Sequence, residues 1–269
     1  MKRVTLGLAA LLAALSFSAS AALAAGGETG APMVTDRPNI AESSLVVPLQ
    51  RFQLETGIEF FDNDIGEFAE VNGFRFPTKL RYGIAEDYEL HVEGTVFNRL
   101  SFDPGDRGEG GLANIDIGGK ANFLDQDGQG TPSLGLLVAL TLPVGDGDVA
   151  PDQTVLRPLL LADWDLVSAL SLSTNLGFLF PLNDRDFTSD FFTFAGSLGI
   201  HPDTLPSGLG FFVELFGFVD LDGDDDAIGI DFGATYLVNN SFQLDAYLRF
   251  GLSDAADDVV GGGGASFLF

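Results

Sequence analysis

Few residues in this sequence have the type and spacing that catalysis needs, and His91 is the first of them. His91 alternates with Glu89 and Glu93, so all three would share one face of a β-strand. A lipid hydrolase would need a nucleophilic serine beside such a histidine, and the local sequence marks no serine as its partner. The other histidine, His201, precedes Pro202 in an expected turn. We therefore expect His91 to join a polar network, and we predict no catalytic residues.

Metal and thiol chemistry are also poorly supported. Asp220, Asp222 and Asp224 have the opening spacing of a calcium-binding loop, but no glutamate completes the loop at the twelfth position. The chain has no cysteine, which excludes disulfides and thiol catalysis. We expect a solvated acidic rim here, and no bound metal or cofactor.

A larger set of charged residues alternates with aliphatic and aromatic side chains along most of the chain. In a sheet that closes across a bilayer, the apolar face contacts lipid and the polar face lines the lumen. The expected lumen-facing residues are Glu55, Glu59, Arg75, Lys79, Arg81, Glu89, His91, Glu93, Asp116, Lys120, Arg157, Asp163, Asp165, Asp245 and Arg249. Leu137, Phe212 and Phe216 are expected on the same face, which would give the lumen one charged and one apolar side.

Two interpretations of these charges remain open. They could set up a transverse field across a water-filled constriction and orient polar solutes. Alternatively, they could neutralise one another in a plugged, water-poor interior, where an unpaired charge is costly.

The elements that must position these residues are strands, and the last ones show the pattern best. Phe242, Leu244, Ala246, Leu248 and Phe250 alternate with more polar residues, and the chain ends on an aromatic residue. About twelve such segments follow one another, as in bacterial outer-membrane barrels. They cover residues 52–60, 74–82, 88–96, 115–123, 133–142, 156–166, 170–180, 192–200, 209–216, 228–236, 242–250 and 259–269.

The predicted fold class is all-β: an antiparallel transmembrane β-barrel of about 12 strands in an up-and-down meander. Short and long connections alternate, which would place both chain ends on the periplasmic side. Pro77 is an expected weak point of the second strand, because proline donates no ladder hydrogen bond. A soluble β-sandwich or lipocalin-like barrel would alternate in the same way, with its apolar face inside. One core of that kind would have to hold an excessive number of large apolar residues.

The N-terminal region divides into two parts ahead of the barrel. Residues 1–24 are predicted to be a signal peptide, with basic, apolar and small-residue regions in that order. Residues 25–50 contain Pro32, Pro38 and Pro48 without alternation, so we expect an irregular segment on the periplasmic side or inside the lumen. Residues 51–269 would form the barrel. The formal net charge of −26 argues against nucleic acid as a partner.

Several motifs along residues 35–269 resemble a known family of outer-membrane transporters, associated with the meta-cleavage pathway of phenol degradation. These motifs are TDRP (35–38), ES (42–43), FQLETG (52–57), LRYG (80–83), EL (89–90), LPVGD (142–146), ADWDL (162–166) and NLG (175–177). The resemblance implies an outer-membrane barrel that transports small or aromatic compounds. It does not imply any set of catalytic residues.

We therefore predict a porin-like channel in the outer membrane of a Gram-negative bacterium. It would allow passive uptake or efflux of small solutes, including aromatic or amphipathic ones. Expected partners are the solute, outer-membrane lipid and lipopolysaccharide, and the barrel-assembly machinery through the C-terminal Phe269. The alternative is a structural or enzymatic barrel, such as a lipid hydrolase.

Overall fold

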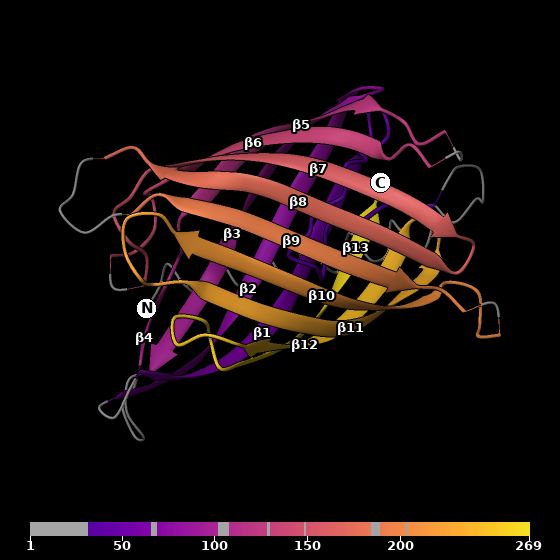
Figure 1. Cartoon of the computed structure of the whole chain (residues 1–269). Helices are drawn as coiled ribbons and strands as arrows, with labels where there is room; N and C mark the ends of the chain where they lie inside the picture. Colours follow the sequence, from indigo (N-terminus) through magenta and orange to yellow (C-terminus); the bar gives the residue numbers. More distant parts are fainter. Residues whose placement is uncertain are drawn as a thin grey trace.

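The computed structural model describes residues 32–65, 69–101, 108–127, 130–147, 149–183, 189–202 and 204–269. In these ranges the chain folds into antiparallel strands that close into a barrel (Figure 1). The predicted signal peptide lies outside the described residues. Among the described residues, no helix has the length and hydrophobicity to cross a membrane.

The strands follow one another around the barrel in chain order. They are β1 (Phe52–Ile65), β2 (Ala69–Ala85), β3 (Tyr88–Ser101), β4 (Glu109–Gly111), β5 (Ile115–Leu124), β6 (Ser133–Leu142), β7 (Val155–Val167), β8 (Leu170–Pro181), β9 (Phe191–Ile200), β10 (Leu209–Asp220), β11 (Ala227–Asn239), β12 (Phe242–Gly251) and β13 (Val259–Leu268).

Closure of the barrel depends on the pairing of its first and last strands. β1 pairs with β13 from Gln53 opposite Leu268 to Asp62 opposite Val259, so neither strand leaves an open edge. The short strand β4 and the longer β5 both pair with β3, at its two ends. Together they make one spanning segment, which confirms the predicted twelve-stranded antiparallel meander.

Pro77 lies within β2 without ending it. The register between β2 and β3 shifts between Arg75 and Pro77, where β3 contributes one more residue than β2. A bulge of this kind is where a sheet tolerates proline, because the missing donor coincides with a break in the ladder. The expected weak point is thus a local irregularity in a continuous strand.

The two ends of the barrel differ in their connections. We call the end with the two-residue connections 86–87, 168–169 and 240–241 the turn end. The opposite end, which includes connections 143–154, 221–226 and 252–258, is the loop end. The C-terminus lies at the turn end, where the Phe269 N–H donates to the Phe52 carbonyl at 2.8 Å.

The outer surface of the barrel is apolar and the inner surface is polar. Leu90, Ile117 and Leu248 are about half exposed, whereas Glu55 and Glu89 are at most 1% exposed. Ring pairs occur towards both ends, with Phe52 stacked on Tyr82 at the turn end and Phe178 on Phe180 towards the loop end. Aromatic residues at both rims and aliphatic residues between them are typical of barrels that cross a membrane.

An arginine on the outer apolar surface should destabilise the barrel in a membrane. Leu176 is 51% exposed in the middle of β8, beside Leu160 of β7. We expect Leu176→Arg to lower the free energy of unfolding from lipid vesicles by about 2–4 kcal/mol, because the charge would enter hydrocarbon.

The matched control is Val144→Arg, which is equally exposed but lies in a loop-end connection. That change should alter the same free energy by no more than about 0.5 kcal/mol. Equal effects of the two variants, measured by denaturant titration, would contradict the assignment of the outer surface to lipid.

Candidate functional site: a chain segment inside the lumen

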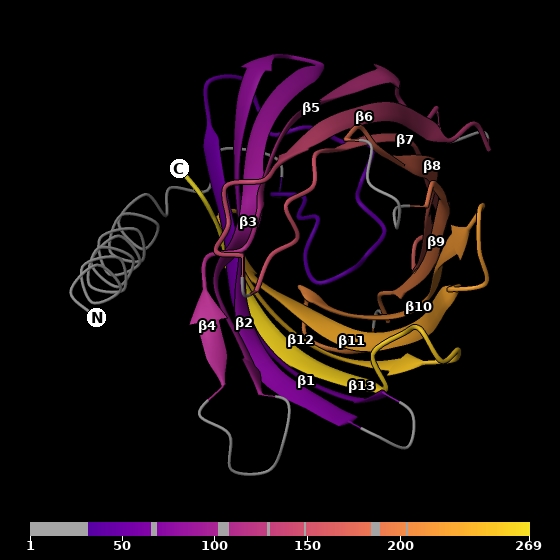
Figure 2. The same cartoon turned by 90° about the vertical axis from the view of Figure 1, so that its left-hand side faces the viewer.

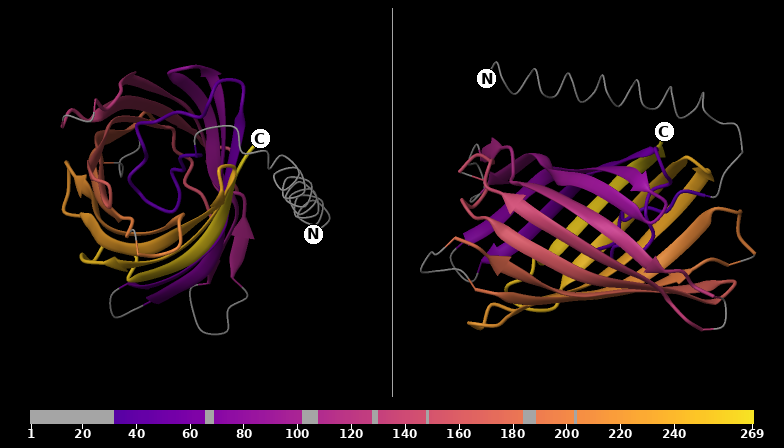
Figure 3. Two further views of the ribbon diagram at one scale, coloured as in Figure 1. Left: turned by 90° about the vertical axis from the view of Figure 1, so that its right-hand side faces the viewer. Right: turned by 90° about the horizontal axis from the view of Figure 1, so that it is seen from above.

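Residues 32–50, which we call the lumen segment, pass through the inside of the barrel. Viewed along the barrel axis, this indigo part of the chain forms a loop within the ring of strands (Figures 2 and 3). It starts near the turn end, where the Met33 N–H donates to the Asn240 carbonyl at 3.0 Å, and returns there, where Gln50 N–H donates to Gly83. The sequence predicts an irregular region over residues 25–50, on the periplasmic side or inside the lumen; residues 32–50 lie in the lumen, and residues 25–31 are outside the described residues.

Carboxylates of the barrel wall accept hydrogen bonds from the backbone of the lumen segment. Glu55 of β1 accepts from the N–H of Arg37 at 2.9 Å, and Glu214 of β10 accepts from the N–H groups of Ile40 and Ala41 at 2.7 and 3.0 Å. Further acceptors are Glu89 for the N–H of Val47 and Asp163 for that of Ser44. A buried peptide group needs such a partner, so these wall side chains replace a neighbouring strand.

Side-chain donors of the wall bind the carbonyl groups of the same segment. The amide of Asn175 both accepts from the Glu42 N–H and donates to the Glu42 carbonyl, at 2.7 and 2.8 Å. Arg81 donates to the carbonyls of Val34 and Leu45, each at 3.2 Å. Gln53 adds a 2.8 Å hydrogen bond to Val34. The segment is thus held from several sides of the barrel.

An ionic cluster links the acidic side chains of the segment to basic residues of the wall. Asp36 forms ion pairs with Lys79 and Lys120, both at 2.9 Å, and a longer one with Arg81 at 3.3 Å. Glu42 pairs with Lys79 at 2.7 Å and with Arg157 at 3.1 Å. All of these charged side chains except Arg157 are buried, where a missing partner would be costly, so the cluster ties the segment to β2, β5 and β7.

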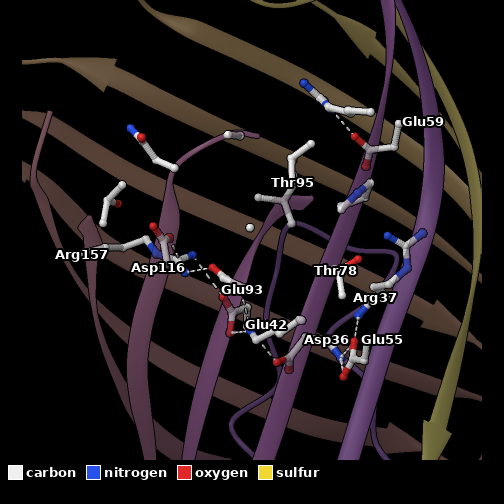
Figure 4. A pocket seen from close by; sticks show the side chains of 18 of the residues that line it. Asp36, Arg37, Glu42, Glu55, Glu59, Thr78, Glu93, Thr95, Asp116 and Arg157 are labelled. Carbon is white, nitrogen blue, oxygen red and sulfur yellow. Dashed lines mark hydrogen bonds and ion pairs between the residues drawn. The ribbon is translucent and has the colours of Figure 1, made fainter. Parts of the chain in front are cut away.

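The wall also supplies carboxylates of its own to this cluster. Arg81 is fully buried between Glu55 and Glu89, each at 2.9 Å. Arg157 is paired with Glu93 and, at 3.6 Å, with Asp116 (Figure 4). Because charges of opposite sign contact each other directly, the structure favours mutual neutralisation around a plug over a transverse field across open water.

Arg37 anchors the segment on the other side of the barrel. Its guanidinium forms an ion pair with Asp245 of β12 at 3.0 Å. Gly57 and Gly264, which face each other across the β1–β13 pairing, leave the space that the guanidinium fills. A Cβ atom on Gly264 would lie 2.5 Å from Arg37 Nη2, closer than real contacts allow.

A second polar group lies towards the loop end. Arg249 pairs with Asp231 at 3.0 Å and lies over the rings of Phe216 and Tyr247. The Tyr247 hydroxyl donates to Glu59. The ion pair, the cation–π contacts and the hydroxyl bond thus join these wall residues to one another.

The lumen segment separates two cavities. One, of about 610 Å³, lies on its loop-end side and is lined by Lys79, Glu93 and Arg157 among others (Figure 4). The other, of about 360 Å³, lies on the turn-end side next to Trp164 and His201. Arg37 and Asn39 line both cavities, so the segment is the partition between them.

The residues predicted to face the lumen are all found inside the barrel or at its mouth. Eight of them line the loop-end cavity: Glu55, Glu59, Arg75, Lys79, Glu93, Asp116, Arg157 and Arg249. Arg81, Glu89, Lys120, Asp163 and Asp245 contact the lumen segment directly. Asp165 is exposed near the turn end. Contact of these residues with a passing solute stays a prediction.

His91 is buried at 2% exposure, against Gly118. Among the described residues, neither of its ring nitrogens has a hydrogen-bond partner, so His91 does not join the expected polar network through hydrogen bonds. No Ser–His pair is therefore formed at this position, which a hydrolase of that type would need.

Several residues of this site do not follow from the sequence pattern. Asp36, Arg37 and Glu42 lie in motifs that carry the family resemblance, but their segment lacks a period from which a face could be assigned. Glu214 and Asp231 lie at alternating positions of apolar strands, and this signal could have identified them as lumen-facing.

Fold and site together define a class: a closed twelve-stranded barrel of the outer-membrane type, with a polar interior. Residues 35–269 match the model of the family described as "Putative MetA-pathway of phenol degradation", and the chain belongs to this family. This agrees with the resemblance noted in the sequence. No curated protein matches the chain.

Solved outer-membrane channels have similar folds. The COG4313 outer membrane channel from Pseudomonas putida F1 is 12% identical with a TM-score of 0.67, over 88% of this chain and 100% of that one. The NanC porin is 10% identical with a TM-score of 0.53, over 79% and 98% of the two chains. The KdgM porin, solved in complex with disordered oligogalacturonate, is 11% identical with a TM-score of 0.53, over 79% and 99%. At these identities the likeness concerns the fold alone.

The space beside Gly264 gives a testable prediction about the lumen segment. We expect Gly264→Ala to lower the free energy of unfolding by about 1–3 kcal/mol, because the new methyl group overlaps the Arg37 guanidinium and the Thr56 carbonyl. Denaturant titration in detergent micelles would measure this.

Gly196→Ala is the matched control, since a Cβ atom on this β9 glycine meets no atom within 4 Å. In an Arg37→Ala background, the cost of Gly264→Ala should shrink because one of its two collisions is gone. If Gly264→Ala lowered the free energy of unfolding by the same amount in that background, Gly264 would not be needed to make space for the Arg37 side chain.

Proposed function

We propose that the protein is a channel for passive passage of small solutes across the outer membrane of a Gram-negative bacterium. The observation that carries this proposal is the pair of cavities on opposite sides of the lumen segment. A barrel with a purely structural role could fill its interior with side chains. Here a single segment, held by polar contacts, separates the two spaces.

The orientation follows from the usual placement of short turns and long loops in such barrels. The loop end would face outwards, and the turn end with the C-terminus would face the periplasm. The acidic connections of the loop end, such as residues 221–226, would lie near lipopolysaccharide. The barrel-assembly machinery would recognise the C-terminal Phe269 during insertion.

The interior suits small amphipathic solutes, including aromatic ones. The loop-end cavity combines charged residues with Phe218, Val149 and Pro151. The turn-end cavity likewise combines polar residues with Met33, Trp164 and Phe212. A solute with one charged and one apolar part would find complementary surfaces at both.

A lipid hydrolase is the less favoured function. The unpartnered nitrogens of His91 are not held by a nucleophile, and over 88% of the chain the fold resembles that of an outer membrane channel.

Passage requires the lumen segment to move, which a disulfide can prevent. Ser44 of the segment and Ser133 of β6 have hydroxyl oxygens 3.0 Å apart, and the chain has no native cysteine. In planar bilayers, the unmodified protein should give discrete conductance steps. The oxidised Ser44→Cys/Ser133→Cys variant should lose them, because the bond ties the segment to the wall, and a reductant should restore them.

The two single variants under oxidant are the controls, and both should conduct. A flat current from the unmodified protein at all voltages would contradict the channel proposal. Full conductance of the oxidised double variant, with the disulfide verified by peptide mass, would instead contradict movement of the segment.

A further inference from the structure

The basic residues of the ionic cluster differ in where their acidic partners come from. Arg81 has two close carboxylates on the wall itself, Glu55 and Glu89. Lys120, by contrast, is hydrogen-bonded to both oxygens of Asp36 at 2.9 and 3.1 Å, while its wall partner Glu89 is 3.8 Å away. The close counter-ion of Lys120 is therefore part of the lumen segment.

Lys79 depends on the same segment. Its Nζ atom contacts Glu42 at 2.7 Å and Asp36 at 2.9 Å, and the wall carboxylate of Glu93 lies at 3.1 Å. Two segment carboxylates thus meet at one ammonium group, so their oxygens lie close together. The two carboxylate groups of one short dicarboxylate could therefore take the positions of the Asp36 and Glu42 carboxylates around Lys79.

The cluster can be approached from the loop-end side. Lys79 and Arg157 line the 610 Å³ cavity together with Asp36 and Glu42, as the close-up shows for all of these but Lys79 (Figure 4). A four-carbon dicarboxylate is much smaller than this space. A solute that entered from the loop end would meet these two basic residues before reaching the partition.

We propose that Lys79, Lys120 and Arg157 form a binding site for a small dicarboxylate. In this structure, Asp36 and Glu42 of the lumen segment occupy the site in place of the solute. A bound dicarboxylate releases both side chains and favours the displaced form of the segment. The site's role in passage rests on the channel function proposed above, but binding itself does not.

Binding of a dicarboxylate would exchange one set of counter-ions for another. Removing Asp36 and Glu42 alone would leave Lys120 with no described carboxylate closer than Glu89 at 3.8 Å and Lys79 with Glu93 alone, and such a loss of charge partners is unfavourable for buried ammonium groups. A dicarboxylate replaces both charges with charge-assisted hydrogen bonds. A monocarboxylate replaces only one, and a ligand shifts the equilibrium only by its preference for the displaced form. Dicarboxylates should therefore act at lower concentrations than monocarboxylates.

A buried cysteine can report displacement without any measurement of current. Ser44 is fully buried, so Ser44→Cys in the full barrel should react slowly with a thiol reagent in detergent micelles. Succinate should accelerate this reaction in a saturable way. Butyrate, at equal ionic strength, should need about tenfold higher concentrations, as expected for the loss of one charge-assisted contact.

Variants of the wall test the assignment of the site. Lys120→Gln should abolish the dependence on succinate, whereas Lys120→Arg keeps the charge and should retain it. Arg249→Gln removes the same charge from the polar group around Asp231 and should leave the dependence intact. Folding of each variant is verified first by its heat-modifiable mobility in gels.

The outcomes separate this proposal from the proposed function. Equal effects of succinate and butyrate, or a succinate effect that survives in folded Lys120→Gln, would overturn the dicarboxylate site while bilayer conductance could still establish the channel. Succinate-dependent labelling in a protein that never conducts would support the site and contradict the channel.

Discussion

A chain that crosses the interior of a closed barrel has no neighbouring strand to satisfy its peptide groups, and this constraint shapes the whole interior. The strands β1 to β13 pair with their neighbours through the ladder. Residues 32–50 have backbone partners near their two ends, at Met33 and Gln50, and side chains of the wall supply partners between them. Glu55, Glu214 and Asn175 provide them from three different strands. Because an unpaired buried peptide group is costly, these contacts decide where the segment lies.

The same constraint explains why the interior carries so many charges. A carboxylate can accept two N–H groups, as Glu55 does from Asp36 and Arg37, but a buried carboxylate must itself be balanced, as Glu55 is by Arg81. The basic residues of β2, β5 and β7 supply that balance, and Asp36 and Glu42 complete it from the segment. Backbone satisfaction and charge neutrality are therefore achieved by one network.

The barrel wall and the lumen segment are held in place by different kinds of contact. The wall is held by continuous ladders that close between β1 and β13. The segment is held by individual polar contacts, each of which a solute or water can replace. The fold shared with the Pseudomonas putida channel and the NanC porin thus supplies a rigid frame, and the interior can be specialised within it.

The alternation of residue types along the chain specifies the wall and its two faces. Alternate residues of a strand point to opposite faces of the sheet. Position along the strand is therefore enough to assign Glu55 and Lys79 to the inner face and Leu90 and Leu248 to the outer face. The contents of the interior, in contrast, depend on the folded barrel. Arg37 and Asp245 are 208 positions apart, and the lumen segment has no period that could indicate its partners. Its path is set by long-range polar contacts, which form only when the barrel has closed around it.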